Sequence, residues 1–218
     1  MKTLLLALSL SFLLFSCSDK SVLLPQIAIS GETDIQNHTE VWVFYKEEEG
    51  KISADLNKNN TVTSTNWIIN IDKRLPLSEV IPVFQFIKAK RSKKSIHRVE
   101  GMKDYLSYSN TLDEKIAVFP INDIQYLLLS KSEIDKINKD KICDYAIRFS
   151  SEIININNQE FRKKSWNKHL LENLESECVQ LQFNSKLSYQ EFLEYRLSVS
   201  KFLPKGVKIE TTEYIYKE

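Results

Sequence analysis

Cys143 and Cys178 are the side chains of this 218-residue chain whose chemistry is simplest to anticipate. Each stands at the start of a predicted strand, so a disulfide between them becomes feasible if the two strands are parallel neighbours. Two buried free thiols are an equally good interpretation, because cysteine is also a common core residue. We expect no metal site, since His38, His97 and His169 are far apart and share no ligand spacing with the cysteines.

A basic cluster is the sharpest surface feature of the sequence. Its five cations lie at the end of a predicted helix: Lys88, Lys90, Arg91, Lys93 and Lys94. One interpretation is structural, because the helix dipole favours cations at the carboxyl end of a helix. The other is functional, with the cluster in contact with phosphate head groups, lipid A or an acidic partner.

Recognisable catalytic motifs are absent from the sequence. The four glycines are scattered, which excludes a glycine-rich phosphate loop, and there is no G-x-S-x-G nucleophile elbow. Isolated acids such as Asp72, Glu79, Glu191 and Glu210 are expected to be solvated surface groups. We therefore predict no catalytic residues and no cofactor.

The first residues indicate an export signal. Lys2 supplies a positive charge, and the apolar run from Leu4 to Phe15 is too short for a membrane-spanning helix, which needs roughly 20 residues. The run ends in Leu14-Phe15-Ser16-Cys17, which resembles the lipobox of bacterial lipoproteins. The resemblance implies a signal peptide over residues 1–16, and palmitate and diacylglycerol on Cys17 as a membrane anchor. An ordinary signal peptide with an incidental cysteine is the alternative.

The rest of the chain is predicted to contain a tether and two folded units. Residues 17–37 are mostly polar and are expected to form the tether. Residues 38–137 and 138–218 each combine strand and helix patterns, and the charged stretch 131–141 marks the expected boundary. The predicted fold class is α+β, with two small sheet-and-helix units of β-α-β organisation.

Apolar patterning places the elements within these units. The expected strands are 41–45, 51–56, 67–71, 96–99, 105–108, 145–149, 153–156, 179–183 and 207–216, with a hairpin of 116–121 and 124–130, and helices that begin near 78, 158 and 188.

Two segments of the chain share one pattern. Residues 71–81 align without gaps on residues 183–193, and both pass from a strand through a polar turn and a leucine into a helix. Internal duplication would explain this pattern, and so would convergent patterning of two β-α-β units.

Residues 143–218 resemble the periplasmic domain of the ExbD/TolR proteins, which couple inner-membrane proton flow to the outer membrane. The resemblance lies in the order of the elements, in Leu187-Ser188-Tyr189-Gln190-Glu191 entering a helix, and in Lys205-Gly206-Val207-Lys208-Ile209 entering the last strand. It implies an ExbD/TolR-like fold for the second unit. That family has an N-terminal transmembrane helix with a proton-carrying acid, which this chain does not match, so no motor function follows.

Taken together, these features predict a non-catalytic, lipid-anchored envelope protein that binds a protein partner or peptidoglycan, as an accessory to an envelope transport complex. Serine after Cys17 is compatible with the periplasm-facing side of the outer membrane of a Gram-negative bacterium. The formal charge of +1 offers no field for nucleic acid, which is not an expected partner. A homodimer stays open, and the competing hypothesis is an envelope hydrolase with an unrecognised active site.

Overall fold

The computed structural model describes residues 20–93, 99–140, 143–157, 159–163, 174 and 176–217. Within them the chain has an α+β fold built from two mixed sheets and three helices. The predicted signal peptide, Cys17, Lys94, and most of the predicted strand 96–99 and of the predicted helix near 158 lie outside the described residues.

The first sheet has the strand order β1-β5-β4-β2-β3, and β6 pairs with β5. β1, β5, β4 and β2 are parallel, whereas β3 and β6 return antiparallel to β2 and β5. The strands are β1 (Gln26–Ile27), β2 (His38–Glu48), β3 (Lys51–Leu56), β4 (Asn66–Ile71), β5 (Asp104–Asn110) and β6 (Lys115–Pro120).

The second sheet has the order β10-β9-β8-β11-β13-β7, and β12 pairs with β11. β8, β11, β13 and β7 are parallel, and β9 and β10 form antiparallel returns. The strands are β7 (Gln125–Ser130), β8 (Tyr145–Phe149), β9 (Ile153–Ile156), β10 (Gln159–Arg162), β11 (Cys178–Asn184), β12 (Lys208–Ile209) and β13 (Thr212–Lys217).

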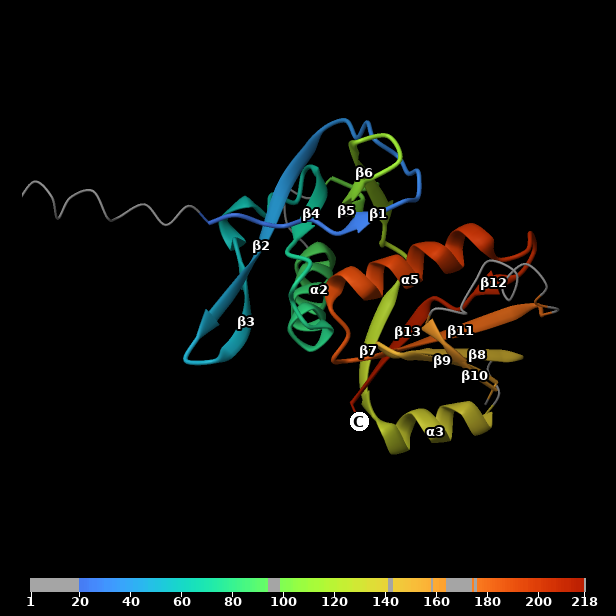
Figure 1. The fold of residues 1–218 in the computed structure, drawn as a ribbon. Helices are drawn as coiled ribbons and strands as arrows, with labels where there is room; N and C mark the ends of the chain where they lie inside the picture. Colours follow the sequence, from blue (N-terminus) through green and yellow to red (C-terminus); the bar gives the residue numbers. More distant parts are fainter. Residues whose placement is uncertain are drawn as a thin grey trace, which may run out of the picture.

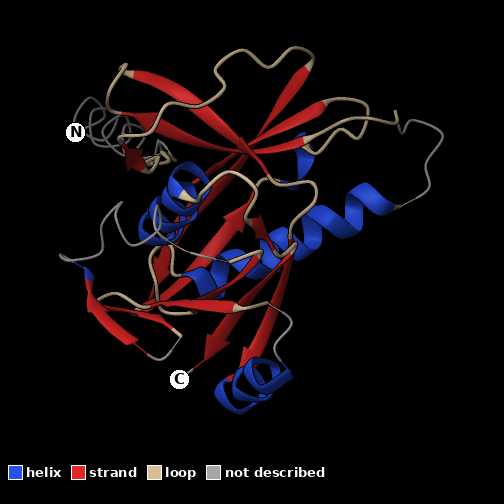
Figure 2. Cartoon of the chain, turned by 90° about the vertical axis from the view of Figure 1, so that its right-hand side faces the viewer, coloured by secondary structure: helices blue, strands red, loops and turns tan. Residues whose placement is uncertain are grey.

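Helices α2 (Leu77–Ser92) and α5 (Tyr189–Phe202) lie between the two sheets (Figures 1 and 2). Their buried side chains join those of both sheets in one continuous apolar core. Helix α3 (Lys131–Asp140) covers the outer face of the second sheet, where Ile134 packs against Tyr214 and Tyr216. A short 3-10 turn, η2 (Lys58–Asn60), completes the described elements. The two units therefore share a core instead of folding around separate ones.

The predicted boundary between residues 137 and 138 is wrong. β6 pairs with β5 in the first sheet, but β7 pairs along its whole length with β13 in the second, so these two segments do not form a hairpin. The chain crosses between the sheets at residues 121–124. In β7, Tyr126 is buried and Leu128 packs against the shared core, while Leu129 packs against the cluster under α3. The charged stretch after it is helix α3, whose exposed face carries the charges.

Residues 159–162 also differ from the prediction, because they form the edge strand β10 instead of a helix.

Residues 20–37 are part of the folded body and not a tether. Pro25, Ile27 and Ile35 are buried, and β1 adds to the edge of the first sheet. The segment also crosses to the second unit, where the Gln26 backbone N–H donates to the side chain of Gln190 and the Gln190 amide donates back to the Gln26 carbonyl. Polar composition concealed this role, because an edge strand needs few apolar side chains once its backbone groups are paired.

The repeated pattern found in the sequence is a structural repeat. Both units run from a hairpin through a parallel strand and a helix to another parallel strand, as β2-β3-β4-α2-β5 and as β8-β9-β11-α5-β13. The corresponding turns meet, with Pro76 bridged to Ser188. Leu77 N–H donates to the Leu187 carbonyl at 2.8 Å, and Tyr189 N–H donates to the Leu75 carbonyl at 2.8 Å.

A second pair of bonds flanks the first. Ser78 N–H donates to the Ser185 carbonyl at 2.9 Å, and Gln190 N–H donates to the Lys73 carbonyl at 3.1 Å. Within each pair of bonds, the two donor residues correspond to each other in the gap-free alignment. The two acceptor residues correspond in the same way. The two turns are thus related by an approximate two-fold axis and satisfy each other's backbone groups.

Truncation of the paired leucines should destabilise both units at once. Leu75 and Leu187 are fully buried at the junction, so Leu75→Ala and Leu187→Ala should each lower the free energy of unfolding by about 2–5 kcal/mol. Urea titration followed by fluorescence and far-ultraviolet circular dichroism should show one shared transition. Two separate transitions in the unmodified chain would contradict a common core.

Candidate functional site: a pocket beside helix α2

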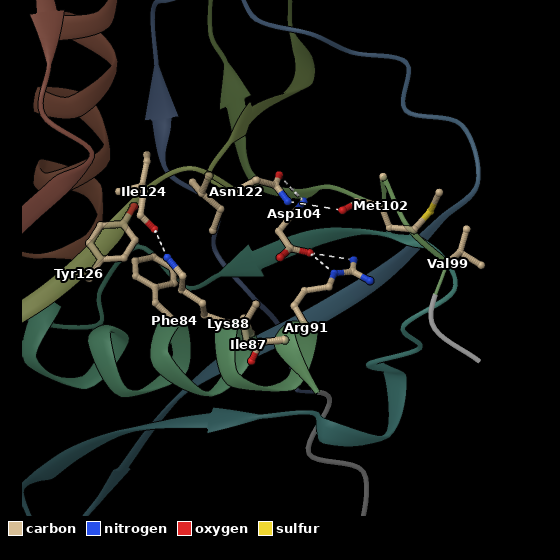
Figure 3. A pocket seen from close by; sticks show the side chains of 13 residues that line it. Phe84, Ile87, Lys88, Arg91, Val99, Met102, Asp104, Asn122, Ile124 and Tyr126 are labelled. Carbon is tan, nitrogen blue, oxygen red and sulfur yellow. Dashed lines mark hydrogen bonds and ion pairs between the residues drawn. The ribbon is translucent and has the colours of Figure 1, made fainter. Parts of the chain in front are cut away.

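A pocket of about 250 Å³ opens at the seam between the two units (Figure 3). Its walls come from the second half of α2, from the loop that precedes β5, and from the segment that crosses between the sheets. Those walls combine apolar side chains with a few polar ones, which is the usual make-up of a ligand site. The lining includes Phe84, Ile87, Lys88, Arg91, Asp104 and Ile124.

Helix α2 positions the cations of the pocket. Its buried face contains Val80, Phe84 and Ile87 at helical spacing, and Arg91 follows Ile87 by one turn on the same face. The periodicity that buries the helix therefore also directs Arg91 inward.

Arg91 contacts an acid, an aromatic ring and backbone carbonyls. Its Nε donates to Asp104 Oδ1 at 2.9 Å, and its Nη2 forms an ion pair with the same oxygen at 2.8 Å; the side chain is only 13% exposed. The guanidinium lies over the ring of Trp67, 3.8 Å from the ring centroid. It also donates to the carbonyls of Thr63 and Thr65 at 3.0 and 2.8 Å. Arg91 is therefore a structural residue that joins α2 to the first sheet, and its charge is compensated within the fold.

Asp104 is fixed at the first position of β5. Its N–H donates to Asn122 Oδ1 at 2.9 Å and its carbonyl accepts from the N–H of Ile121 at 2.9 Å. Burial raises the pKa of the Asp104 carboxyl above its ordinary value, and the hydrogen bond from Arg91 opposes that rise. The result is a carboxylate that is 7% exposed on its side chain and lines the pocket.

The predicted basic cluster does not form one surface. Lys88 stands at the pocket and donates to the Ile124 carbonyl at 3.2 Å, while Lys90 donates to Thr61 elsewhere on the helix. Lys93 is exposed beyond the helix end. Because Arg91 is mostly covered and paired with Asp104, the expectation of a continuous anionic-partner patch is wrong for the described members, and only Lys88 of them joins Arg91 at the pocket.

The inner wall of the pocket leads into a second buried polar group. Tyr126 stacks on Phe84 with ring centroids 4.6 Å apart, and its buried hydroxyl has no hydrogen-bond partner among the described residues. Burial raises the pKa of Tyr126, and the nearby Glu213 carboxylate adds to this. Glu213 is itself fully buried and paired with Arg196. This cluster lies at the junction of the two units, beneath the apolar wall.

Three of the four isolated acids of the sequence make local structural contacts, and the fourth, Glu79, lies in the first turn of α2. Asp72 is fully buried, which corrects the expectation of a solvated group. Burial alone would raise its pKa, but hydrogen bonds from the Arg74 side chain and from the N–H groups of Arg74 and Leu23 hold the pKa below its ordinary value. Glu191 completes a capping box with Ser188, and Glu210 accepts from the Tyr214 hydroxyl at 2.8 Å.

The structure joins Cys143 to Cys178. Their Cα atoms are 5.0 Å apart, and the neighbouring residues Tyr145 and Val179 are partners in the parallel register of β8 and β11. This is the arrangement of adjacent parallel strand starts under which the sequence made a disulfide feasible.

Comparison of the chain with family models, with curated proteins and with solved structures found no match. In the described part of the chain, no helix combines the length and the apolar character needed to cross a membrane. The same residues contain no group of three or more histidine, cysteine, aspartate or glutamate side chains that could bind a metal ion.

Sequence reasoning missed Asp104 as a site residue. The signal was weak: an acid directly before an apolar strand can be a turn residue, a strand-end cap or a buried ion-pair partner. Its partner Arg91 belongs to the basic cluster that the sequence predicts as a surface feature, although the apolar periodicity of the helix continues through Phe84 and Ile87. Extending that periodicity by one turn would have marked Arg91 as inward and in need of an acid.

Removing Arg91 should destabilise the fold, because it leaves the buried Asp104 carboxylate without its ion-pair partner. We expect Arg91→Ala to lower the free energy of unfolding by about 3–5 kcal/mol. Lys93→Ala, at an exposed position just beyond the end of the same helix, should change it by less than about 0.5 kcal/mol. Chemical denaturation of both variants makes the comparison, and equal effects would show that the Arg91–Asp104 pair is not structural.

The disulfide can be counted by alkylation. Denatured chain without reductant should incorporate no iodoacetamide at Cys143 or Cys178, and reduction should make both reactive in mass spectrometry. Because the bond closes a loop with a sequence separation of 35, Cys143→Ser should lower stability by about 2–4 kcal/mol. Alkylation of both cysteines before reduction would contradict the bond.

Proposed function

We propose that this chain is a non-catalytic, lipid-anchored binding protein of the bacterial cell envelope, cut before Cys17 and tethered through lipid on that residue. The observation that carries the binding role is the pocket beside α2, where the buried carboxylate of Asp104 faces a space with apolar walls. The Cys143–Cys178 bond supports export, because disulfides persist in oxidising compartments.

The anchor would hold the folded body close to the membrane. The described body begins at Lys20, which pairs with Asp55 at 2.7 Å, and three residues extend no farther than about 10 Å. The bonds between Gln26 and Gln190 then connect the anchored end to the second unit. In this proposal the protein presents its pocket at the membrane surface, on the periplasmic side of the outer membrane, to a protein partner or to peptidoglycan.

We further propose that the second unit is related to the ExbD/TolR periplasmic domain and that the protein is accessory to an envelope transport complex. The order β8-β9-β11-α5-β13, with α5 entered through the capping box of Ser188 and Glu191, supports this relation. The pocket supports a binding role for this protein, and we propose no motor function for it.

The proposal of a lipid anchor predicts where the protein is found. After fractionation of cells that express the full chain, the protein should be in the membrane fraction, and its N-terminal peptide should carry acyl chains on Cys17 by mass spectrometry. Cys17→Ala should release the protein from membranes, because the two or three acyl chains that give stable anchoring are lost.

The partner is tested in the same cells. Native detergent extracts should yield an envelope protein or a cell-wall fragment with the unmodified chain, and less of it with Asp104→Asn. An unacylated N-terminus would refute the anchor, and repeated recovery of neither class of partner would refute the binding role.

A further inference from the structure

The Asp104 carboxylate has one oxygen available to a ligand. Arg91 Nε donates to Oδ1 and Arg91 Nη2 forms an ion pair with the same oxygen, and within the described residues Oδ2 accepts no hydrogen bond. Figure 3 shows the carboxylate at the centre of the lining, with one oxygen joined to Arg91 and the other directed away from it. A carboxylate oxygen without a partner at the wall of a pocket can accept a hydrogen bond from a ligand, so this end of the pocket suits an N–H or O–H group.

The charges already present in the pocket determine whether the donor to Asp104 should be cationic or neutral. Arg91 already compensates Asp104, and Lys88 adds a further positive charge at the mouth. A second cation against Asp104 would therefore leave the pocket with excess positive charge, whereas a neutral N–H would not. Lys88 uses one of its three N–H groups on Ile124 and can offer the others to an anion.

Apolar walls connect these two polar ends. Phe84, Ile87, Ile121 and Ile124 are all at most 9% exposed, and they surround a volume of about 250 Å³. That space admits one apolar side chain of moderate size together with a short polar backbone.

We propose that this pocket binds the C-terminal residue of a polypeptide when that residue is apolar. The terminal carboxylate would pair with Lys88, its amide N–H would donate to Asp104 Oδ2, and its side chain would pack on Phe84 and Ile87. The inference deepens the proposed function and rests on it, since it defines the chemistry of the partner that the envelope protein binds.

The test uses N-acetyl-L-leucine, which has the acylated N–H, the apolar side chain and the carboxylate. Isothermal titration of the full chain in detergent should show saturable binding at one site. N-acetyl-L-leucine amide, which lacks the carboxylate, should bind about tenfold more weakly, as expected when a hydrogen bond to a charged group is lost. These two measurements need no variant and are therefore independent of folding defects.

Two variants test the individual contacts. Lys88→Met removes the cation from an exposed position. Asp104→Asn keeps an oxygen that accepts from Arg91 but replaces Oδ2 with an NH2 group, which cannot accept the N–H of the ligand. Each should weaken binding of N-acetyl-L-leucine about tenfold. Lys90→Met, on the same helix but away from the pocket, is the matched control and should leave the affinity unchanged. Thermal unfolding would verify that each variant is folded.

Several results would overturn the proposal. They are equal binding of the acid and the amide, absence of binding to the unmodified chain, an unchanged affinity in Lys88→Met, and tighter binding of N-acetyl-D-alanine, which would point to a cell-wall peptide. If the chain is acylated and recovers an envelope partner but does not bind N-acetyl-L-leucine, the ligand chemistry alone is wrong. If it is unacylated and recovers no partner, the proposed function is wrong as well.

Discussion

The backbone bonds between the turns at Pro76 and Ser188 are the constraint on which the rest of the fold depends. Each turn leaves N–H and carbonyl groups at the start of a helix, where intrahelical partners are missing. The two turns use each other as partners, which fixes where α2 and α5 start and how they lie between the sheets. Both sheets then bury their inner faces on the same pair of helices, so neither unit has a complete core without the other.

The candidate site is a consequence of that junction. Helix α2 contributes Phe84 and Ile87 to the shared core, and its last turn places Arg91 over the Trp67 ring and against Asp104. Chain crossing at residues 121–124 closes the other side of the pocket, because β7 belongs to the second sheet. A pocket with apolar walls and the Arg91–Asp104 ion pair therefore lies where the first unit ends and the second begins. Its polar groups are held rigidly, as a specific binding site requires.

The N-terminal segment, residues 20–37, forms hydrogen bonds to both turns of this junction. Leu23 bonds to Asp72 and Lys73 in the first turn, and Gln26 bonds to Gln190 at the start of α5. Asp72 and Asn184 are counterparts in the repeat, and each accepts the N–H two residues later, from Arg74 and Lys186. Within the described residues, Asp72 also accepts the N–H of Leu23, whereas the Asn184 side chain accepts no bond from the N-terminal segment, so the repeat is asymmetric at this segment.

The sequence by itself determined the α+β class, most of the strands, the repeat between the segments around Pro76 and Ser188, and the feasibility of the Cys143–Cys178 bond. These depend on local periodicity and on residue type, which are properties of short stretches. Tertiary structure alone decided that β7 joins the second sheet, that residues 20–37 are folded, and that Arg91 pairs with the buried Asp104. Such outcomes depend on which distant backbone edge or opposite charge is within reach, and no local pattern of polarity records that distance.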